Sequence, residues 1–378
     1  MRHLVLAGGG HAQLAVLASL RRRALPGVAV TLVSPTARQA YSGMLPGWMA
    51  GHYALEQCEI DLQSLATAAG VRFLEDSIAA IDADRRCLAL ASGRTVHYDL
   101  LSLDVGSETD VSRLAPLGQR LVAVRPLAVF IARWPSLLAE AIRSPSYRLA
   151  VAGGGAAALE LALAASSAFR RAGAARTVSL ITPADGLLPC FSRRVRSLAR
   201  DAAEAASLDI RYGPAAGSLH GLLLPDGREI EANHVIAATG AVPPGWLRRL
   251  GPALDERGFI RVDDTLRSVS HPDIFAAGDV CARSGTPLER SGVHAVRAGP
   301  VLAANLRAAL AGEPLRRFMP RRRSLYLLGC GPRRAIATWG PLSAEGQWAW
   351  RWKDRIDRAF VARHSIPGLR GPARGVPT

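Results

Sequence analysis

A glycine-rich phrase that occurs twice constrains this chain more than any other feature. Residues 8–15 read GGGHAQLA and residues 153–160 read GGGAAALE. Each phrase follows a short strand-like run, at residues 2–7 and 146–152, and precedes a run with helical character. The phrases are therefore strand-to-helix turns, in which glycine permits a tight turn and lets a pyrophosphate approach the N-terminus of the helix.

The repeat extends beyond these glycines. The fingerprint positions hold Gly8, Gly10 and Gln13 in the first copy and Gly153, Gly155 and Ala158 in the second. A second strand then ends at Ser34 and at Thr182, where this fold usually places an acid that binds the ribose hydroxyls. A hydroxyl can also bind a ribose, so the choice between NADH and NADPH stays open. Each half ends with a strand that is followed by Gly106 or Gly240. The two glycine turns, which we call nucleotide cradles, thus have matching strands around them and imply two bound dinucleotides.

Composition limits the other possibilities. The 378 residues are 49% hydrophobic and 21% charged, which predicts two domains or slightly more. The most apolar stretch, residues 149–169, is interrupted by three glycines and Glu160, so we expect no transmembrane segment. No export signal is recognisable, so we expect a cytoplasmic protein. The five cysteines are too scattered for a zinc cluster or a CxxC pair, and no metal site is expected.

The charge is unusual in kind. The net charge of +16 comes almost wholly from arginine, because Lys353 is the only lysine. Such a surface favours anionic ligands or an acidic lipid surface. No base-stacking module accompanies the arginines, so we expect no binding to nucleic acid.

A third motif follows the second half. Residues 257–282 read RGFIRVDDTLRSVSHPDIFAAGDVCA, with a strand that ends in AAGD at residues 276–279. With this motif the sequence resembles, over about residues 2–315, the pyridine nucleotide-disulfide oxidoreductases, which bind two dinucleotides. Because a CxxxxC pair is missing, it is most similar to the type II NADH dehydrogenase-like branch. The resemblance implies FAD and NADH or NADPH as cofactors.

The resemblance also implies an architecture. We expect an α/β protein with two Rossmann-like three-layer dinucleotide-binding domains, the second inserted in the first, and a small C-terminal region. The FAD domain would comprise residues 1–113 and 254–317, and the NAD(P)H domain residues 114–253. Residues 318–378 would form the C-terminal region, with a basic amphipathic helix.

The resemblance and the glycine turns together assign candidate site residues. Asp279 would bind the flavin ribityl chain, and a helix that begins near residues 292–295 would stabilise the reduced ring with its N-terminus. The residues expected at FAD are Gly8, Gly10, His11, Ala12, Ser34, Ser42, Gly43, Met44, Leu45, Pro46, Val105, Gly106, Gly278, Asp279, Val293 and His294. Those expected at NAD(P)H are Gly153, Gly155, Ala156, Ala157, Thr182, Thr239 and Gly240. Three positions, Gln13, Asp104 and Val105, depart from the family pattern.

Glu160 is the candidate catalytic residue. It matches a glutamate that related dehydrogenases place near the stacked nicotinamide and flavin, where it would orient the carboxamide or assist protonation. As an acid near a helix N-terminus it would alternatively only favour the helix dipole. A hydride would pass from NAD(P)H to flavin N5, and the electrons would then leave to a quinone or another small acceptor. Cys330 is a candidate redox thiol or an inert buried one.

Two features leave the partners open. Residues 40–53, residues 101–107 and the ending GQWAWRWKDRIDRAF are similar to a subgroup associated with selenide, water dikinase, so an accessory flavoprotein of selenophosphate synthesis is the alternative function. In residues 346–363, Trp348, Trp352, Ile356 and Phe360 recur every four residues among basic residues. This stripe would pack on its own protein, form a homodimer, or rest on the inner face of a membrane.

Overall fold

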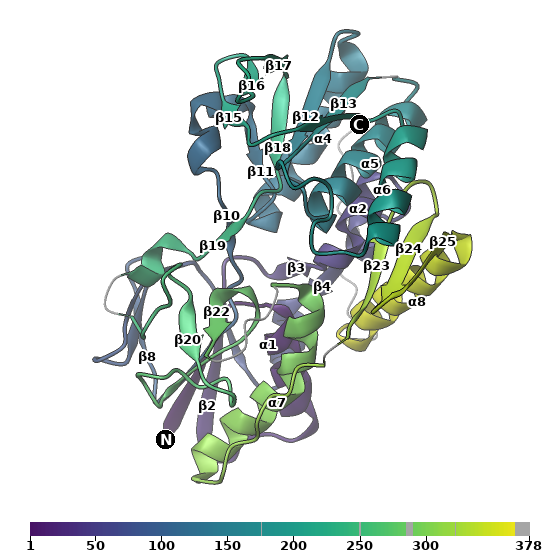
Figure 1. Cartoon of the computed structure of the whole chain (residues 1–378). Helices are drawn as coiled ribbons and strands as arrows, with labels where there is room; N and C mark the ends of the chain where they lie inside the picture. Colours follow the sequence, from purple (N-terminus) through teal and green to yellow (C-terminus); the bar gives the residue numbers. More distant parts are fainter. Residues whose placement is uncertain (175, 249–250, 285–289, 322, 367–378) are drawn as a thin grey trace.

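The structure of the protein, a computed structural model, describes residues 1–174, 176–248, 251–284, 290–321 and 323–366. The last part of the expected C-terminal region, residues 367–378, lies outside the described residues. The described chain forms two nucleotide-fold lobes joined by a narrow connection, with the C-terminal elements packed along one side of both (Figure 1).

The first lobe is built on a parallel five-stranded sheet. Its strands, in spatial order, are β21 (Ile274–Ala276), β9 (Leu100–Leu103), β1 (Arg2–Ala7), β2 (Val28–Ser34) and β5 (Arg72–Glu75). The strands β1 and β9 consist almost entirely of buried residues, as expected where helices or other layers cover both faces of a parallel sheet. Strand β21 comes from far along the chain, so the lobe is assembled from two separate segments.

The second lobe repeats the first strand for strand. Its parallel sheet has the order β11 (Leu121–Ala123), β18 (His234–Ala237), β12 (Arg148–Ala152), β13 (Thr177–Thr182) and β14 (Asp209–Tyr212). All five strands lie between β9 and β21 in sequence. The structure therefore confirms the predicted α/β class with one nucleotide fold inserted in the other, while the exact domain boundaries stay a prediction.

Helices cover both sheets and meet between the lobes. Helix α1 packs closely against α7 in the first lobe, and α2 of the first lobe contacts α5 of the second. The α-helices are α1 (His11–Arg22), α2 (Leu45–Met49), α3 (Leu62–Ala68), α4 (Leu127–Arg143), α5 (Ala156–Arg171), α6 (Arg193–Ala205), α7 (Gly292–Ala311) and α8 (Gln347–Arg363). Short 3-10 helices are η1 (Ser42–Met44), η2 (Leu55–Gln57), η3 (Ser112–Arg120), η4 (Gly245–Arg248) and η5 (Gly278–Val280).

Small sheets complete the lobes and connect them. The antiparallel pair β10 (Glu108–Thr109) and β19 (Ala241–Val242) runs between the lobes. The others are β3 (Arg38–Ala40) with β4 (Glu59–Asp61), β15 (Ala216–Gly217) with β16 (Gly221–Leu223) and β17 (Glu229–Glu231), and β20 (Ile260–Val262) with β22 (Cys281–Arg283).

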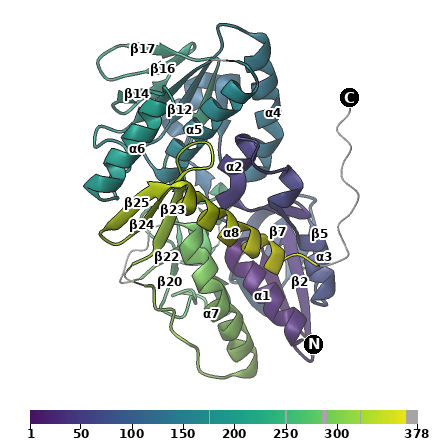
Figure 2. The same ribbon diagram turned by 90° about the vertical axis from the view of Figure 1, so that its right-hand side faces the viewer.

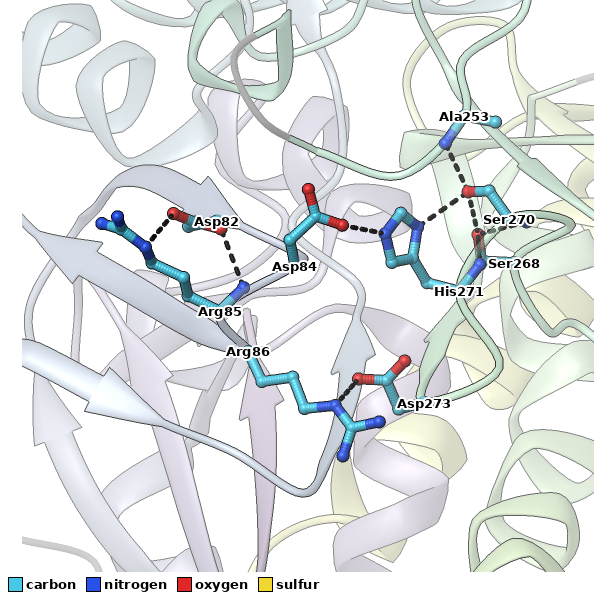
Figure 3. A network of polar contacts seen from close by, with 9 residues as sticks. All are labelled: Asp82, Asp84, Arg85, Arg86, Ala253, Ser268, Ser270, His271 and Asp273. Carbon is cyan, nitrogen blue, oxygen red and sulfur yellow. Dashed lines mark hydrogen bonds and ion pairs between the residues drawn. The ribbon is translucent and has the colours of Figure 1, made fainter.

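Polar contacts hold the two segments of the first lobe together. The sheet of β6 (Ile78–Asp82), β7 (Cys87–Leu90) and β8 (Thr95–His97) faces the returning segment before β21. Arg86 Nε lies 3.0 Å from Asp273 Oδ2 and His271 Nε2 lies 3.4 Å from Asp84 Oδ1, and Figure 3 draws both contacts as dashed lines. Each contact is partly exposed and worth at most about 1 kcal/mol, so the pairs fix orientation more than they stabilise the fold.

The C-terminal region lies against both lobes. It forms an antiparallel sheet of β23 (Leu325–Gly329), β24 (Ala335–Trp339) and β25 (Leu342–Gly346), followed directly by α8. In Figure 2, α8 crosses the molecule between α2 and α1. No helix in the described part of the chain is both long enough and apolar enough to cross a bilayer.

Candidate functional site

The first glycine turn surrounds a buried carboxylate. The backbone N–H of Gly10 donates to the Asp104 carbonyl at 3.1 Å, and the N–H groups of Ala12 and Gln13 donate to Asp104 Oδ2 at 2.7 and 3.0 Å. Asp104 therefore caps the N-terminus of α1. Three glycines make room for it, because a Cβ at Gly8, Gly10 or Gly278 would approach an Asp104 atom to within 2.3–2.4 Å.

The second glycine turn shares contacts with the first but surrounds a smaller residue. Gly153 N donates to Ile181 O at 2.8 Å as Gly8 N does to Val33 O, and a Cβ at Gly153 would lie 2.3 Å from the Ala238 carbonyl oxygen. Ala238 thus corresponds to Asp104. Its methyl group accepts no hydrogen bond, and a Cβ at Gly155 would meet open space among the described residues. The start of α5, at the predicted residues Ala156 and Ala157, is therefore accessible to a phosphate.

The departure at Gln13 has a structural reason. Its buried side chain donates from Nε2 to the Ser102 carbonyl at 2.8 Å, and its Oε1 accepts from Ser102 Oγ at 3.0 Å. The amide thus joins α1 to β9 where the family pattern uses a small residue. Because both the nitrogen and the oxygen of the Gln13 amide have hydrogen-bond partners, the buried glutamine is tolerated.

The predicted ribose ligands lie where expected but have local partners. Ser34 and Thr182 end the equivalent strands β2 and β13, and both are buried. Ser34 Oγ donates to Thr36 O at 3.1 Å, and Thr182 Oγ1 donates to Pro183 O at 3.3 Å. To bind a ribose, either hydroxyl would have to accept a hydrogen bond from a ribose hydroxyl, or donate to the ribose in place of its present backbone carbonyl.

Asp279 has a cationic partner that sequence reasoning missed. Arg125 Nη1 lies 2.9 Å from Asp279 Oδ2 and donates to Ser107 Oγ at 2.5 Å. Gly278 and Asp279 begin η5, directly after β21, and they line a cavity of about 430 Å³ together with His294 of α7. Val293 and His294 lie in the first turn of α7. The structure therefore gathers the AAGD motif and the N-terminus of α7 at one cavity.

The predicted ring-covering stretch divides into core and cavity residues. Met44 and Leu45 are buried in the hydrophobic core, whereas Ser42 is exposed. Gly43 and Pro46 line a small cavity beside α5. Of this stretch, Gly43 and Pro46 therefore face a candidate site.

His11 lies in the first turn of α1 but faces α8. Its ring centroid is 5.4 Å from that of Tyr41 and 5.7 Å from that of Phe360. Burial lowers the pKa of His11 to about 4, so the imidazole is neutral at pH 7. The helix start thus gains no cationic charge from this side chain.

Glu160 occupies a cavity to which both lobes and the C-terminal region contribute. The cavity has a volume of about 40 Å³, and its lining includes Gly43 after β3, Glu160 of α5, Gly329 of β23, and Trp350 and Lys353 of α8. Glu160 Oε1 accepts from Gly329 N at 2.6 Å. Burial raises the pKa of Glu160 to about 6, although the Lys353 ammonium and the Gly329 amide oppose the shift.

Lys353 is a second residue of this site. The sequence marked it only as the lone lysine and as one of the basic residues in the predicted amphipathic helix. Its side chain is 14% exposed, and Nζ donates to the Gly43 carbonyl and to Asp357 Oδ2, both at 2.6 Å. Asp357 is 4% exposed and also binds the Tyr41 hydroxyl. A buried ion pair therefore fastens α8 to the segment beside the candidate flavin site.

The other predicted residues lie near the connection between the lobes. Thr239 Oγ1 donates to the Asp110 carbonyl, and Gly240 O accepts from Asp110 N at 2.8 Å. Gly106, with φ +73°, adopts a conformation that favours glycine directly after β9 and Val105. These residues shape the connection, and contact with a nucleotide stays a prediction for them.

Cys330 does not have the surroundings of a reactive thiol. It is 4% exposed, and Sγ lies 3.5 Å from Glu345 Oε1. Burial and the Glu345 carboxylate raise the pKa of the thiol, which opposes the thiolate needed for redox chemistry. The inert alternative is therefore favoured. Within the described residues no group of three His, Cys, Asp or Glu side chains is arranged to hold a metal ion.

The outer face of α8 is exposed. Of the predicted stripe, Phe360 alone is buried and stacks on Tyr41 at 4.5 Å, whereas Trp348, Trp352 and Ile356 are 51%, 43% and 41% exposed. The two tryptophan rings stack on one another at 6.3 Å. The described residues of the chain do not bury this face.

Known proteins share both the sequence pattern and the fold. An NADH dehydrogenase-like protein of Mycobacterium tuberculosis is 29% identical over 246 residues, which cover 60% of this chain and 60% of that protein. A p-cumate 2,3-dioxygenase system ferredoxin–NAD(+) reductase component of Pseudomonas putida is 29% identical over 74% of this chain and 68% of its own length. The chain thus spans about three fifths of the mycobacterial relative.

Solved structures resemble the fold at low identity. NDH2 from Plasmodium falciparum in complex with NADH superposes with a TM-score of 0.80 at 12% identity, covering 95% of this chain and 97% of that one. The sulfide:quinone oxidoreductase from Aquifex aeolicus gives 0.78 at 17% identity, covering 98% and 93%. The sequence pattern described as pyridine nucleotide-disulphide oxidoreductase matches residues 2–299. With its paired nucleotide folds and this match, the chain belongs to the pyridine nucleotide-disulphide oxidoreductase family, whose cofactors are FAD and NAD(P)H.

Proposed function

We propose that the protein is an FAD-dependent NAD(P)H oxidoreductase that passes electrons to a quinone or another small acceptor without a redox disulfide. The observation that carries the proposal is the cavity at Glu160, which both lobes and the C-terminal region line together. The first lobe would bind FAD through residues 1–113 and 254–317, and the inserted lobe would bind NAD(P)H. When bound, FAD would supply the redox chemistry, as a carrier of two electrons between NAD(P)H and the acceptor.

The accessible start of α5 supports the nicotinamide assignment. Because a Cβ at Gly155 would meet no described atom and the Ala238 side chain offers no competing acceptor, a pyrophosphate could approach the first N–H groups of α5. Glu160 lies one helical turn further along α5, in the cavity beside Gly43 and Lys353. We infer that it holds a proton for the acceptor, since its raised pKa keeps it partly protonated near pH 6.

Anaerobic spectroscopy tests the proposal. Full-length protein should be yellow and should bleach with NADH or NADPH, and an acceptor panel of ubiquinone, menaquinone and ferredoxin should then restore the colour at different rates. Gly155→Val should slow bleaching strongly without lowering FAD content, because the added branches fill the phosphate position. A colourless preparation, or bleaching unaffected by Gly155→Val, would reject the assignment.

Glu160→Gln separates the two roles of the carboxylate. If Glu160 supplies a proton to the acceptor, the variant should bleach normally with NAD(P)H but reoxidise slowly with quinone. Its reoxidation rate should also lose the pH dependence centred near 6. A variant that bleaches slowly and reoxidises normally would instead assign Glu160 to the nicotinamide carboxamide.

We further propose that α8 rests on an anionic membrane surface. The exposed Trp348, Trp352 and Ile356 form an apolar strip, and the exposed Arg351 and Arg355 flank it. Each cation near an anionic leaflet adds about 1 kcal/mol of binding free energy. Docking there would bring lipid quinones to the helix that carries Lys353.

Co-sedimentation with vesicles tests this surface. Vesicles that contain phosphatidylglycerol should retain the wild type and should release the double variant Trp348→Ala/Trp352→Ala. Trp339→Ala is the matched control, because Trp339 is 50% exposed on β24 outside this helix. Equal retention of both variants would contradict the proposal.

Specific co-purification with selenide, water dikinase, together with negligible quinone reduction, would favour the accessory function that the subgroup resemblance suggests.

A further inference from the structure

One difference between the two glycine turns of this chain is a buried carboxylate, present at Asp104 and absent at Ala238. Asp104 and Ala238 occupy the same place. Each directly follows the strand, β9 or β18, that pairs with the strand before the glycine turn, and each donates its N–H to the residue before that turn, Ala7 or Ala152, at 2.8 and 2.9 Å. Each carbonyl oxygen also faces the first glycine of its turn. The second cradle therefore shows what the first would be without a carboxylate.

The carboxylate takes the donors that a phosphate would use. At the start of α1, the N–H groups of Ala12 and Gln13 donate to Asp104 Oδ2, and the Gly10 N–H donates to the Asp104 backbone carbonyl. A helix N-terminus attracts anions because its first N–H groups lack helical partners. A pyrophosphate that reaches this turn meets a negative charge already seated there, only 3% exposed and poorly screened by water.

The charged groups around Asp104 do not neutralise it. His11 on α1 is neutral at pH 7, as its lowered pKa shows, and Asp279 on η5 is a second anion that pairs with Arg125. On β22, Cys281 stays a thiol because burial raises its pKa to about 12. Arg290 Nε donates to the Asp279 carbonyl at 3.3 Å, and α7 contributes His294 to the neighbouring cavity.

We propose that Asp104 makes flavin binding proton-linked: FAD binds tightly only when the Asp104 carboxyl is protonated, because the ionised form competes with the pyrophosphate for the N-terminus of α1. This inference rests on the proposed FAD site in the first lobe. On binding, one proton is taken up from solvent by an Asp104 oxygen, and no covalent bond changes. The carboxylic acid can then donate to a phosphate oxygen instead of repelling it.

Burial supports the existence of the protonated form at neutral pH. It raises the pKa of Asp104 to about 7, although the Ala12 and Gln13 amides oppose the shift. At pH 8 only about a tenth of the molecules would carry the proton. The apparent Kd for FAD would therefore be about tenfold higher at pH 8 than at pH 6 or below, because affinity scales with the competent fraction.

Equilibrium dialysis of the full-length protein against FAD between pH 5.5 and pH 8.5 tests the proposal. The wild-type Kd should rise about tenfold between pH 6 and pH 8, and about thirtyfold across the whole range. Asp104→Asn keeps the shape and removes the charge, so its Kd should stay flat at the wild-type low-pH value. A pH dependence of equal size in both proteins, or weaker FAD binding by Asp104→Asn at pH 8, would overturn the inference while leaving the proposed function intact.

The second cradle provides an independent arm. Ala238→Asp places the same carboxylate at the start of α5, so the Kd for NAD(P)H should increase at least tenfold at pH 8, with FAD binding unchanged. Unaltered NAD(P)H affinity in this variant would count against the mechanism even if Asp104→Asn failed to fold. Absence of FAD binding by both the wild type and Asp104→Asn at every pH would overturn the proposed function itself.

Discussion

Replacing Lys353 with methionine should destabilise the protein in a way that reveals the buried ion pair. Methionine fills a similar volume but removes the ammonium that donates to Gly43 O and Asp357 Oδ2. Asp357, 4% exposed, then lacks its cation and keeps the Tyr41 hydroxyl as a partner. Breaking a buried pair by removing one partner costs about 3–5 kcal/mol, so we expect a loss of this size in the free energy of unfolding at pH 8.

The loss should depend on pH. Burial already raises the pKa of Asp357, and removal of Lys353 raises it further, so the carboxyl can escape its unpaired charge by taking up a proton. A group with a raised folded-state pKa contributes stability below its unfolded pKa and loses it as pH rises through the folded pKa. Lys353→Met should therefore be less destabilised at pH 5 than at pH 8.

Urea unfolding followed by tryptophan fluorescence measures both effects. The control is the double variant Lys353→Met/Asp357→Asn, which removes both charges and keeps a hydrogen-bonding group for Tyr41. It should recover about 2 kcal/mol or more of the loss in the single variant. The reasoning is refuted if Lys353→Met lies within about 0.5 kcal/mol of the wild type at pH 8, the range of ordinary surface substitutions.

Two further predictions concern stability. Burial raises the folded-state pKa of Asp104 to about 7, whereas the pKa is about 3.9 in the unfolded chain. Between pH 5 and pH 8 the wild type should therefore lose roughly 2–3 kcal/mol more unfolding free energy than Asp104→Asn. Equal losses of unfolding free energy in the two proteins, measured with urea, would contradict this prediction. Gly299→Ala should lower stability by about 1–3 kcal/mol, because its Cβ would lie 2.7 Å from the Ala15 Cβ and force α1 and α7 apart. Gly245→Ala is its control, since a Cβ there meets open space among the described residues, and equal thermal midpoints of the two variants would show that the helix contact tolerates the methyl group.

The features repeated in sequence were the ones that could be predicted. The glycine turns, the strands before and after them and the AAGD segment all lie where their local patterns place them, because a strand-to-helix turn depends on nearby residues. The insertion of one lobe in the other was implied by the family resemblance that these motifs carry, and the strand order confirms it. The local patterns by themselves placed only the turns and the strands around them.

The residues that sequence reasoning missed act through distant contacts. Arg125 forms an ion pair with Asp279, 154 positions away, and no sequence motif near either residue indicates this pairing. Asp104 was visible as a departure from the family pattern, but its role as a cap of α1 depends on three glycines from two separate segments. Lys353 carried one usable signal: a lone lysine among arginines suggests a place where a compact ammonium is required.

The α8 stripe shows the opposite limit. Its four-residue spacing indicated an amphipathic helix correctly, but spacing alone does not say which face is covered. The helix buries Ala349, Asp357, Phe360 and Val361, so a charged residue lies inside and two tryptophans lie outside. The ion pair between Lys353 and Asp357 thus places charge on the covered face of α8, where the spacing predicts apolar residues.

The return of β21 to the edge of the first sheet has a consequence for biosynthesis. A ribosome releases every strand of the inserted lobe before it reaches residues 274–276, so that lobe can collapse while the N-terminal sheet still lacks its outermost strand. Until then the edge of β9 offers unpaired backbone groups to other chains. Truncation upstream of residue 274 should accordingly yield aggregates from the nascent N-terminal portion, and a compact, protease-resistant fragment from the middle of the polypeptide.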